Sequence, residues 1–105
     1  MEFKTFQAEY GGKQIALAVC GLHHYPYEVS TLVLYELHVA PEYRRQGIAS
    51  NLLKQVISYA KENKVALIEL VSPVENEAVS IYEKAGFVHR KEISIYTLDM
   101  KTEKV

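Results

Sequence analysis

Apolar residues downstream of Gly47 recur at intervals of three and four positions, with polar residues between them. The apolar positions are Ile48, Leu52, Leu53, Val56, Ile57 and Ala60. This spacing predicts an amphipathic helix of about four turns, because it places the apolar side chains on one face. A shorter stripe of Ala78, Ile81, Tyr82 and Ala85 predicts a second helix. We expect Gly86 to end it, since glycine readily adopts the left-handed backbone that terminates helices.

The remaining apolar sequence has strand-like patterns. The predicted strands are Phe3–Tyr10, Lys13–Leu22, Thr31–Val39, Val65–Val71 and Glu92–Leu98. Gly11 and Gly12 predict a tight hairpin turn, and Pro41 closes the third strand. Val65–Val71 is nearly continuous apolar sequence, which is typical of a central strand covered on both faces and parallel to its neighbour Thr31–Val39. The order β-β-β-α-β-α-β predicts an α/β fold with a mixed central sheet and a parallel β-α-β core.

Composition narrows the class of protein. The chain has 105 residues, enough for a single domain over 1–105, and we expect 101–105 to be a frayed tail. A formal net charge of −1 gives no overall positive field for nucleic acid. The single cysteine, Cys20, lies in an apolar run, which favours a buried, inert thiol and a reducing compartment. No apolar run approaches the roughly 18 residues needed to span a bilayer, so we expect a cytoplasmic protein without membrane contact.

The chemically most informative stretch is Arg44-Arg45-Gln46-Gly47-Ile48-Ala49, between a strand and a helix. The first N–H groups of a helix lack internal partners and carry the positive end of its dipole, so a glycine here lets a phosphate approach the backbone. Arg44 and Arg45 would add mobile positive charge. The stretch lacks the Gly-Lys-Ser/Thr ending that holds a metal-bound triphosphate. The alternative interpretation is an ordinary solvated turn between strand and helix.

Two motifs give this stretch a family context. Leu37-His38-Val39-Ala40-Pro41-Glu42-Tyr43 precedes the loop, and Asn76, Ala78, Ile81-Tyr82 and Gly86-Phe87 follow it. From Leu32 to Phe87 the chain resembles the GNAT superfamily of N-acetyltransferases, whose acyl-CoA loop reads Arg/Gln-x-x-Gly-x-Gly/Ala. The Tyr-rich run from His24 to Glu36 is most similar to the polyamine (diamine) acetyltransferase branch.

The resemblance implies acetyl-CoA as co-substrate and an amine of a small molecule or polypeptide as acceptor. It implies that backbone groups of the strand before the loop pair with the pantetheine arm and that the N–H of Val39 donates to the thioester carbonyl. The cofactor-binding residues implied are Leu37, His38, Val39, Arg44, Arg45, Gln46, Gly47, Ile48, Ala49, Ser50 and Asn76. For Leu37 and Val39, plain core packing is an equally simple interpretation.

The resemblance also implies catalytic roles. Tyr82 matches the family tyrosine that protonates the departing thiolate, and a phenol with a pKa of about 10 still carries its proton at neutral pH. By helical spacing alone, Tyr82 would be only the aromatic of an amphipathic stripe. Glu36, which interrupts an apolar strand, is the candidate base for the acceptor amine, although a glutamate there is often simply solvated. Glu69, a charge within Val65–Val71, is the second choice.

The chain departs from the family pattern at two places. Asn76 lies one residue closer to Tyr82 than the family usually places it, with Glu75 at the expected position, and one residue turns a helical side chain by about 100°. The usual strand and two helices at the front are absent before Phe3. The chain is then a minimal enzyme, a subunit whose partner completes the site, or part of something longer. Apolar surface left uncovered by the missing elements predicts a homodimer or a partner subunit. The alternative function is that of a non-catalytic acyl-CoA-binding or scaffolding subunit.

Histidine and tyrosine residues suggest two further sites. His23, His24, His38 and His89 match no usual metal-ligand spacing, so we expect no metal. Tyr25, Tyr27 and Tyr35 are candidates to line an acceptor pocket, because aromatic faces attract ammonium groups. An ordinary aromatic packing patch explains the same residues.

Overall fold

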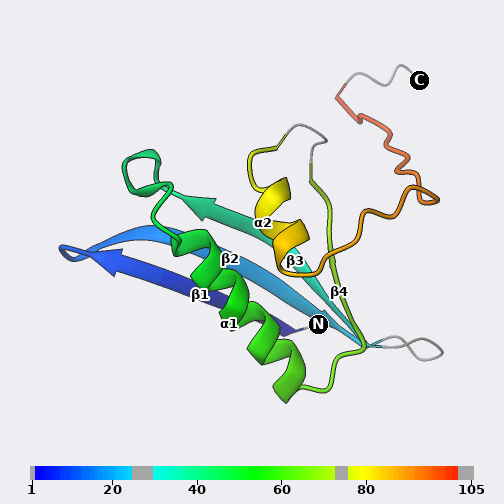
Figure 1. The fold of residues 1–105 in the computed structure, drawn as a ribbon. Helices are drawn as coiled ribbons and strands as arrows, with labels where there is room; N and C mark the ends of the chain where they lie inside the picture. Colours follow the sequence, from blue (N-terminus) through cyan, green and yellow to red (C-terminus); the bar gives the residue numbers. More distant parts are fainter. Residues whose placement is uncertain (1, 25–29, 73–75, 102–105) are drawn as a thin grey trace.

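A four-stranded mixed sheet with two helices makes up the computed structural model, which describes residues 2–24, 30–72 and 76–101 (Figure 1). The elements are β1 (Glu2–Tyr10), β2 (Lys13–His23), β3 (Thr31–Val39), a 3-10 turn (Pro41–Tyr43), α1 (Ile48–Glu62), β4 (Leu67–Leu70) and α2 (Val79–Lys84). The strand order is β1-β2-β3-β4, with antiparallel pairing up to β3 and parallel pairing between β3 and β4. The predicted parallel β-α-β core is therefore confirmed.

The β1–β2 hairpin turns at the paired glycines, as predicted. Gly11 and Gly12 have φ angles of 59° and 79°. Positive φ at both central positions suits a two-residue hairpin turn, whose twist matches that of the flanking strands. The pairing continues along the length of β1, with one register shift between Ala8 and Glu9.

The core lies between the sheet and α1. Both helices lie over the same face of the sheet in Figure 1, and α1 contacts β1, β2 and β3. Leu52, Leu53 and Val56 of α1 are at most 1% exposed. Burying such a side chain contributes about 1.5–3 kcal/mol each, so α1 is held firmly against the sheet. The strand residues of this core are Ala16, Ala18, Cys20, Leu22, Leu32, Leu34 and Val39. No helix in the described ranges is long and apolar enough to cross a membrane.

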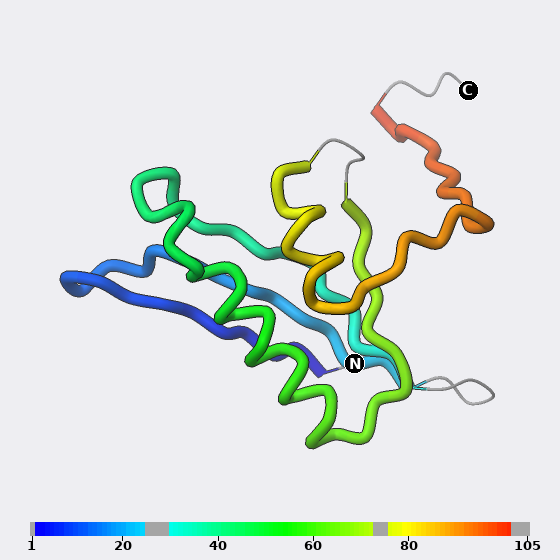
Figure 2. The backbone as a smooth tube through the Cα atoms, viewed as in Figure 1, coloured from blue at the N-terminus to red at the C-terminus, as the bar shows by residue number. Residues whose placement is uncertain are grey.

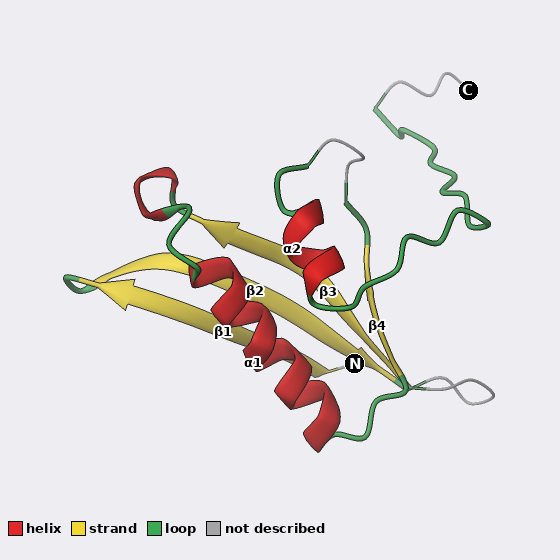
Figure 3. Cartoon of the chain, viewed as in Figure 1, coloured by secondary structure: helices red, strands yellow, loops and turns green. Residues whose placement is uncertain are grey.

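The end of the chain differs from the prediction. Glu92–Leu98 was expected to form a last strand, but Figure 3 shows this stretch as loop. A strand forms only where a neighbour takes up its backbone hydrogen bonds, and strand-forming residues alone do not supply one. β4 is correspondingly shorter than Val65–Val71, and its side chains alternate between exposed and half-buried instead of being covered on both faces. Residues 102–105 of the expected tail lie outside the described residues.

Cys20 is fully buried in the core, as predicted. Burial disfavours the charged thiolate and raises the pKa of the Cys20 thiol to about 11. Since the thiolate is the reactive form, the folded protein presents almost no nucleophilic sulfur at neutral pH.

We therefore expect Cys20 to resist iodoacetamide in the native protein at pH 8 and to react rapidly once the chain is unfolded in guanidinium. Raising the pH from 8 to 10 should accelerate labelling of the native protein by a larger factor than labelling of the unfolded chain. The buried thiol, with its pKa raised to about 11, gains thiolate throughout this range, whereas the unfolded thiol, with an ordinary pKa of about 8.5, is already largely ionised above pH 9. Mass spectrometry of the alkylated chain measures both rates. Equal rates in the folded and unfolded states would contradict the burial of this thiol.

Candidate functional site

The candidate site begins where β3 and β4 separate. The parallel pairing runs only from Thr31 with Leu67 to Leu34 with Leu70, whereas β3 continues to Val39. Figure 1 shows the two strands starting together and diverging toward their carboxyl ends. Residues 35–39 of β3 therefore have an unpaired edge on the side away from β2, with no described strand beside it. This edge is the feature that the sequence resemblance led us to expect.

The register of β2 and β3 shows which backbone groups lie on the unpaired edge. The Ala40 N–H donates to the Ile15 carbonyl at 2.8 Å, so it points toward β2. Backbone groups alternate sides along a strand, and Val39 lies opposite Ala16. The N–H groups of Val39 and Leu37 consequently face the unpaired edge. Those of His38 face β2, so only the exposed His38 side chain is available for the role that the sequence suggested.

The loop between β3 and α1 adopts a conformation that gathers N–H groups. Arg45 and Gly47 have φ angles of 62° and 80°, in the left-handed region. Gly47 is the N-cap of α1, and the first helical hydrogen bond runs from the Asn51 N–H to the Gly47 carbonyl at 3.0 Å. A left-handed residue followed by a helical one turns successive N–H groups toward a common point, which is a known anion-binding arrangement.

The first turn of α1 carries no side chain that offsets the positive end of the helix dipole. It has no acidic residue and no side-chain cap. The N–H groups of Ile48, Ala49 and Ser50 therefore keep the positive end of the helix dipole uncompensated. The sequence predicted this role for the turn, but it gave no signal for the positive φ of Arg45, a conformation that costs about 1–2 kcal/mol for a residue with a side chain.

Arg44 links the loop to the end of β3. Its Nε donates to the Val39 carbonyl at 2.9 Å. Because the N–H and C=O of one residue in an antiparallel ladder point to the same side, this bond draws the Arg44 guanidinium to the unpaired edge of β3. The sequence predicted two mobile arginines, and the structure instead anchors Arg44, while Arg45 is exposed. A contact between an arginine and a backbone oxygen leaves no mark in residue patterns.

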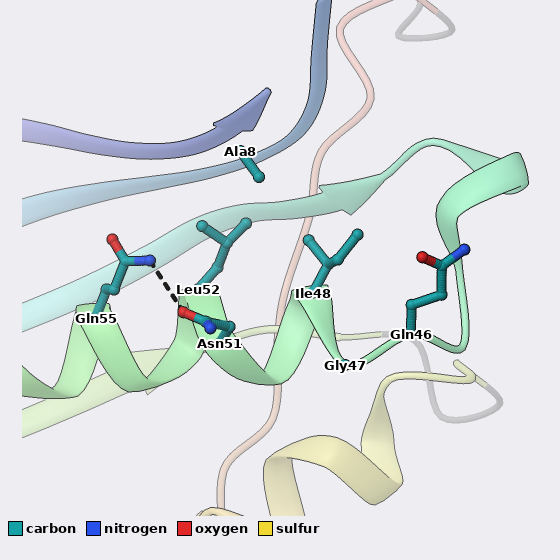
Figure 4. Close-up of a pocket in the computed structure, with 7 residues that line it drawn as sticks. All are labelled: Ala8, Gln46, Gly47, Ile48, Asn51, Leu52 and Gln55. Carbon is teal, nitrogen blue, oxygen red and sulfur yellow. Dashed lines mark hydrogen bonds between the residues drawn. The ribbon is translucent and has the colours of Figure 1, made fainter. Parts of the chain in front are cut away.

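A shallow hollow lies on the other side of the same loop (Figure 4). Its volume is about 250 Å³, and it is lined by Ala8, Gln46, Gly47, Ile48, Asn51, Leu52 and Gln55. Ala8 belongs to β1, so the hollow opens toward β1 and not toward β4. A hydrogen bond from Gln55 Nε2 to Asn51 Oδ1 at 3.2 Å closes its far wall. The hollow shares Gln46, Gly47 and Ile48 with the loop but is separate from the unpaired edge of β3.

Tyr82 is positioned by α2 and by the chain that follows it. Gly86, with a φ of 102°, ends the helix as predicted, and the Phe87 N–H then donates to the Tyr82 carbonyl at 3.0 Å. The Tyr82 and Phe87 rings lie 6.0 Å apart, and both pack against the core. Partial burial disfavours the phenolate and raises the pKa of Tyr82. The phenol is thus a protonated group at neutral pH, as a general acid requires.

Asn76 stabilises the turn that leads into α2. Its Oδ1 accepts a hydrogen bond from the Ala78 N–H at 2.7 Å, and its backbone carbonyl accepts one from the Val79 N–H at 3.1 Å. Asn76 therefore satisfies N–H groups just before and at the start of α2. Glu75, the residue at the family's usual asparagine position, lies outside the described residues.

The two candidate bases share the other face of the sheet. Glu36 pairs in register with Val19, and Glu69 pairs with Val33, whereas the core side chains belong to the alternate positions. Both carboxylates are exposed. Tyr82 packs on the α1 side. The candidate acid and the candidate bases therefore lie on opposite faces of the sheet, with the unpaired edge of β3 between them.

Among the histidine and tyrosine residues singled out in the sequence, His23 and Tyr35 lie next to each other in the structure. Tyr35 is half-exposed, and its hydroxyl lies 2.6 Å from Nε2 of His23. Its ring lies 6.2 Å from that of Phe3, so Tyr35 is part of a small aromatic cluster. Tyr25 and Tyr27 lie outside the described residues. Within the described ranges, no group of three or more His, Cys, Asp or Glu side chains is arranged to hold a metal ion.

Comparison with known proteins gives this geometry a context. The sequence model of the Acetyltransferase (GNAT) family matches residues 2–87. An uncharacterised N-acetyltransferase of Methanocaldococcus jannaschii is 29% identical over 89 residues, covering 82% of this chain and 39% of that protein. The ribosomal protein bS18-alanine N-acetyltransferase of Escherichia coli K12 is 29% identical over 86 residues, covering 81% of this chain and 55% of that protein.

Solved structures agree with the fold. The crystal structure of a probable acetyltransferase superposes with a TM-score of 0.79 at 25% identity, covering 97% of this chain and 70% of that one. The NatC complex bound to Gag peptide and CoA contains a chain that matches with a TM-score of 0.71 at 29% identity, covering 74% of this chain and 50% of that one.

These relatives bear on two questions: which branch of the family the chain resembles, and how much of its relatives' length the chain spans. This chain spans about half the length, or less, of the curated relatives described above. The relative with a named substrate acts on a ribosomal protein. The relatives therefore come from branches other than the polyamine branch that the Tyr-rich run suggested, and they give that assignment no support.

Proposed function

The chain belongs to the Acetyltransferase (GNAT) family, and on that premise we propose that it is an acetyl-CoA-dependent N-acetyltransferase that acylates a primary amine of a small molecule or polypeptide by direct attack. The observation that carries the proposal is the unpaired edge of β3, with the Val39 N–H facing it, beside an uncapped helix N-terminus. The names of the bS18-alanine relative and of the peptide-bound NatC complex favour a polypeptide amine as acceptor.

The chain carries groups that suit each part of acetyl-CoA. The N–H groups of Ile48, Ala49 and Ser50, with the left-handed Gly47 before them, suit the negatively charged pyrophosphate. Arg44, anchored on the Val39 carbonyl, and the exposed Arg45 add positive charge nearby. The amide groups of Leu37 and Val39 suit the pantetheine arm, which carries amide groups that an unpaired strand edge can bind.

When bound, acetyl-CoA supplies the activated acetyl group. The Val39 N–H then has a defined task on this chain, which is to donate to the thioester oxygen and stabilise the negative charge that develops there. A fixed backbone donor is effective because it needs no reorganisation during the reaction. The hydrogen bond of the next residue, from the Ala40 N–H to Ile15, fixes the direction in which the Val39 N–H points.

Proton transfer completes the proposal. The acceptor arrives as an ammonium and must lose a proton before attack, for which Glu36 is the base, acting directly or through water. Glu36 lies on the face of the sheet that α1 leaves uncovered, where an acceptor has access. Tyr82, on the α1 side, holds the proton that the departing thiolate needs. Burial keeps this phenol protonated by raising its pKa.

Calorimetric titration tests acetyl-CoA binding directly. We expect the wild type to bind acetyl-CoA with micromolar affinity and Gly47→Glu to lose at least about tenfold in affinity, because it places a carboxylate where the helix dipole attracts the pyrophosphate. Gly12→Glu is the matched control. Gly12 has a φ of 79° against 80° for Gly47, and an added side chain has open space at both positions. The two variants share backbone strain and charge but differ in position.

We expect Gly12→Glu to bind acetyl-CoA like the wild type, with circular dichroism showing that both variants are folded. Wild-type affinity in Gly47→Glu would contradict the phosphate-binding role of the loop. Absence of binding by the folded wild type would contradict the cofactor assignment and leave the catalytic proposal without support.

Tyr82→Phe removes the proposed acid and keeps the ring. We expect kcat to fall by about 10²- to 10⁴-fold with little change in KM for acetyl-CoA, since the proton is needed only as the thiolate departs. Because burial raises the Tyr82 pKa above its ordinary value of about 10, the wild-type rate should show no loss from this group below pH 10. Tyr59→Phe, on α1 against the Phe6 ring, is the control and should keep its rate. A Tyr82→Phe variant with the wild-type kcat would contradict the role.

Glu36→Gln tests the proposed base through the pH profile. We expect kcat/KM to fall at pH 7 and to recover toward the wild-type value near pH 9, where an α-amine with a pKa of about 8 loses its proton to water. Glu69→Gln is the comparison, on the same face of the sheet. If Glu69→Gln shows this pH dependence and Glu36→Gln does not, Glu36 is not the base.

A further inference from the structure

Exposed apolar side chains gather in the last part of the chain that the structure describes. In the segment Ile93–Met100, which we call the C-terminal segment, the large apolar side chains are between 64 and 93% exposed. They are Ile93, Ile95, Tyr96, Leu98 and Met100. Figure 2 shows the chain after α2 leading outward from the sheet, with this segment, drawn in orange to red, along the outward path. Such a run of exposed apolar side chains is unfavourable in water unless another surface covers it.

The outer edge of β4 is another exposed and partly apolar surface. It is the last strand of the described sheet, so its outer edge, on the side away from β3, has no described strand beside it. Leu67, the first residue of β4, and Val71, directly after its last residue, are 50 and 72% exposed. An edge with unpaired backbone groups and apolar neighbours is a template for the addition of another strand. No proline interrupts β4 and no lysine or arginine protects it, although Glu69 lies at its middle.

The C-terminal segment has the properties of the missing strand. It reads Ile-Ser-Ile-Tyr-Thr-Leu-Asp-Met, which is rich in β-branched and aromatic residues and contains neither proline nor glycine. It has the length of an ordinary strand and exceeds that of β4. Its apolar residues occupy both alternate positions, Ile93 and Ile95 on one side and Tyr96 and Leu98 on the other. A strand that adds to β4 would need apolar side chains toward both faces of the sheet.

We propose that the C-terminal segment of one copy of this chain pairs with the outer edge of β4 in a second copy, and that the second copy reciprocates. Within one chain the segment is directed away from β4. A turn just before it, with the Arg90 Nε to Glu92 Oε1 ion pair at 3.0 Å and the Ile93 N–H to Arg90 carbonyl bond at 3.4 Å, leads in that direction. Reciprocal exchange forms a closed two-fold dimer in which both edges are paired, whereas one-sided addition would polymerise.

The strand exchange would also affect the candidate site by holding β4 in place. The proposed dimer itself does not depend on acetyl transfer. β4 pairs with β3 through only four residues and then diverges from its unpaired edge. A strand added to the outer edge of β4 would hold β4 from its other side. The dimer would thereby fix the position of the strand that faces the unpaired edge of β3.

Ile95→Pro tests the pairing with little cost to the single chain. Among the described residues the Ile95 N–H makes no hydrogen bond, and its side chain is exposed, so proline removes nothing that the single chain uses. In a ladder, proline removes a donor and disrupts pairing. The matched control is Ile95→Val, which keeps the N–H and the β-branched side chain. Sedimentation equilibrium at micromolar concentration should give twice the 12.0 kDa chain mass for the wild type and Ile95→Val, and the single mass for Ile95→Pro.

Isotope-filtered NMR on a mixture of labelled and unlabelled chains then shows which chain supplies the strand. We expect contacts between the two chains that join residues 93–100 to residues 67–71. A monomeric wild type, a dimer that survives Ile95→Pro, or contacts of the segment with β4 only within one chain would each overturn the proposal. Because none of these measurements uses acetyl-CoA, their outcome is independent of the proposed enzymatic activity.

Discussion

The parallel pairing between β3 and β4 ends at Leu34 and Leu70, and the candidate site depends on this limit. If β3 were paired along its whole length, the N–H groups of Leu37 and Val39 would donate to the neighbouring strand. No backbone donor would then remain for a ligand. Because β3 continues to Val39 beyond the pairing, the strand keeps a rigid antiparallel partner on one side and free groups on the other. The candidate site is therefore built largely from main-chain atoms, which is why residues as ordinary as Leu37 and Val39 are proposed to take part in it.

Packing of α1 holds this arrangement in place. The helix buries Leu52, Leu53 and Val56 against the sheet, while its first turn stays open beside the end of β3. The Arg44 bond to the Val39 carbonyl joins the loop to the strand, so the donors of the helix and the strand are fixed relative to one another. Core and site thus share one helix. Fixed donors of this kind are what stabilisation of a developing charge requires.

The sequence predicted the elements that depend on local pattern. α1 follows from helical spacing, the hairpin from Gly11 and Gly12, and the parallel pair from β3 and a following apolar run. The prediction that Glu92–Leu98 forms a strand was wrong, because a strand depends on a neighbouring strand that residue patterns do not locate. The positive φ of Arg45 and the bond from Arg44 to a backbone oxygen were also missed. Both arise from the three-dimensional path of the loop and not from side-chain periodicity.

The most direct test of the account is an amide NMR titration of the ¹⁵N-labelled chain with acetyl-CoA. The account predicts that the largest shifts fall on the N–H groups of Leu37, Val39 and the first turn of α1, with the Ala40 N–H, which is bonded to Ile15, changing less. Shifts confined to the hollow between α1 and β1, or to the β1–β2 hairpin, would contradict it. Such a result would show that the unpaired edge of β3 is not where this chain holds its acetyl donor.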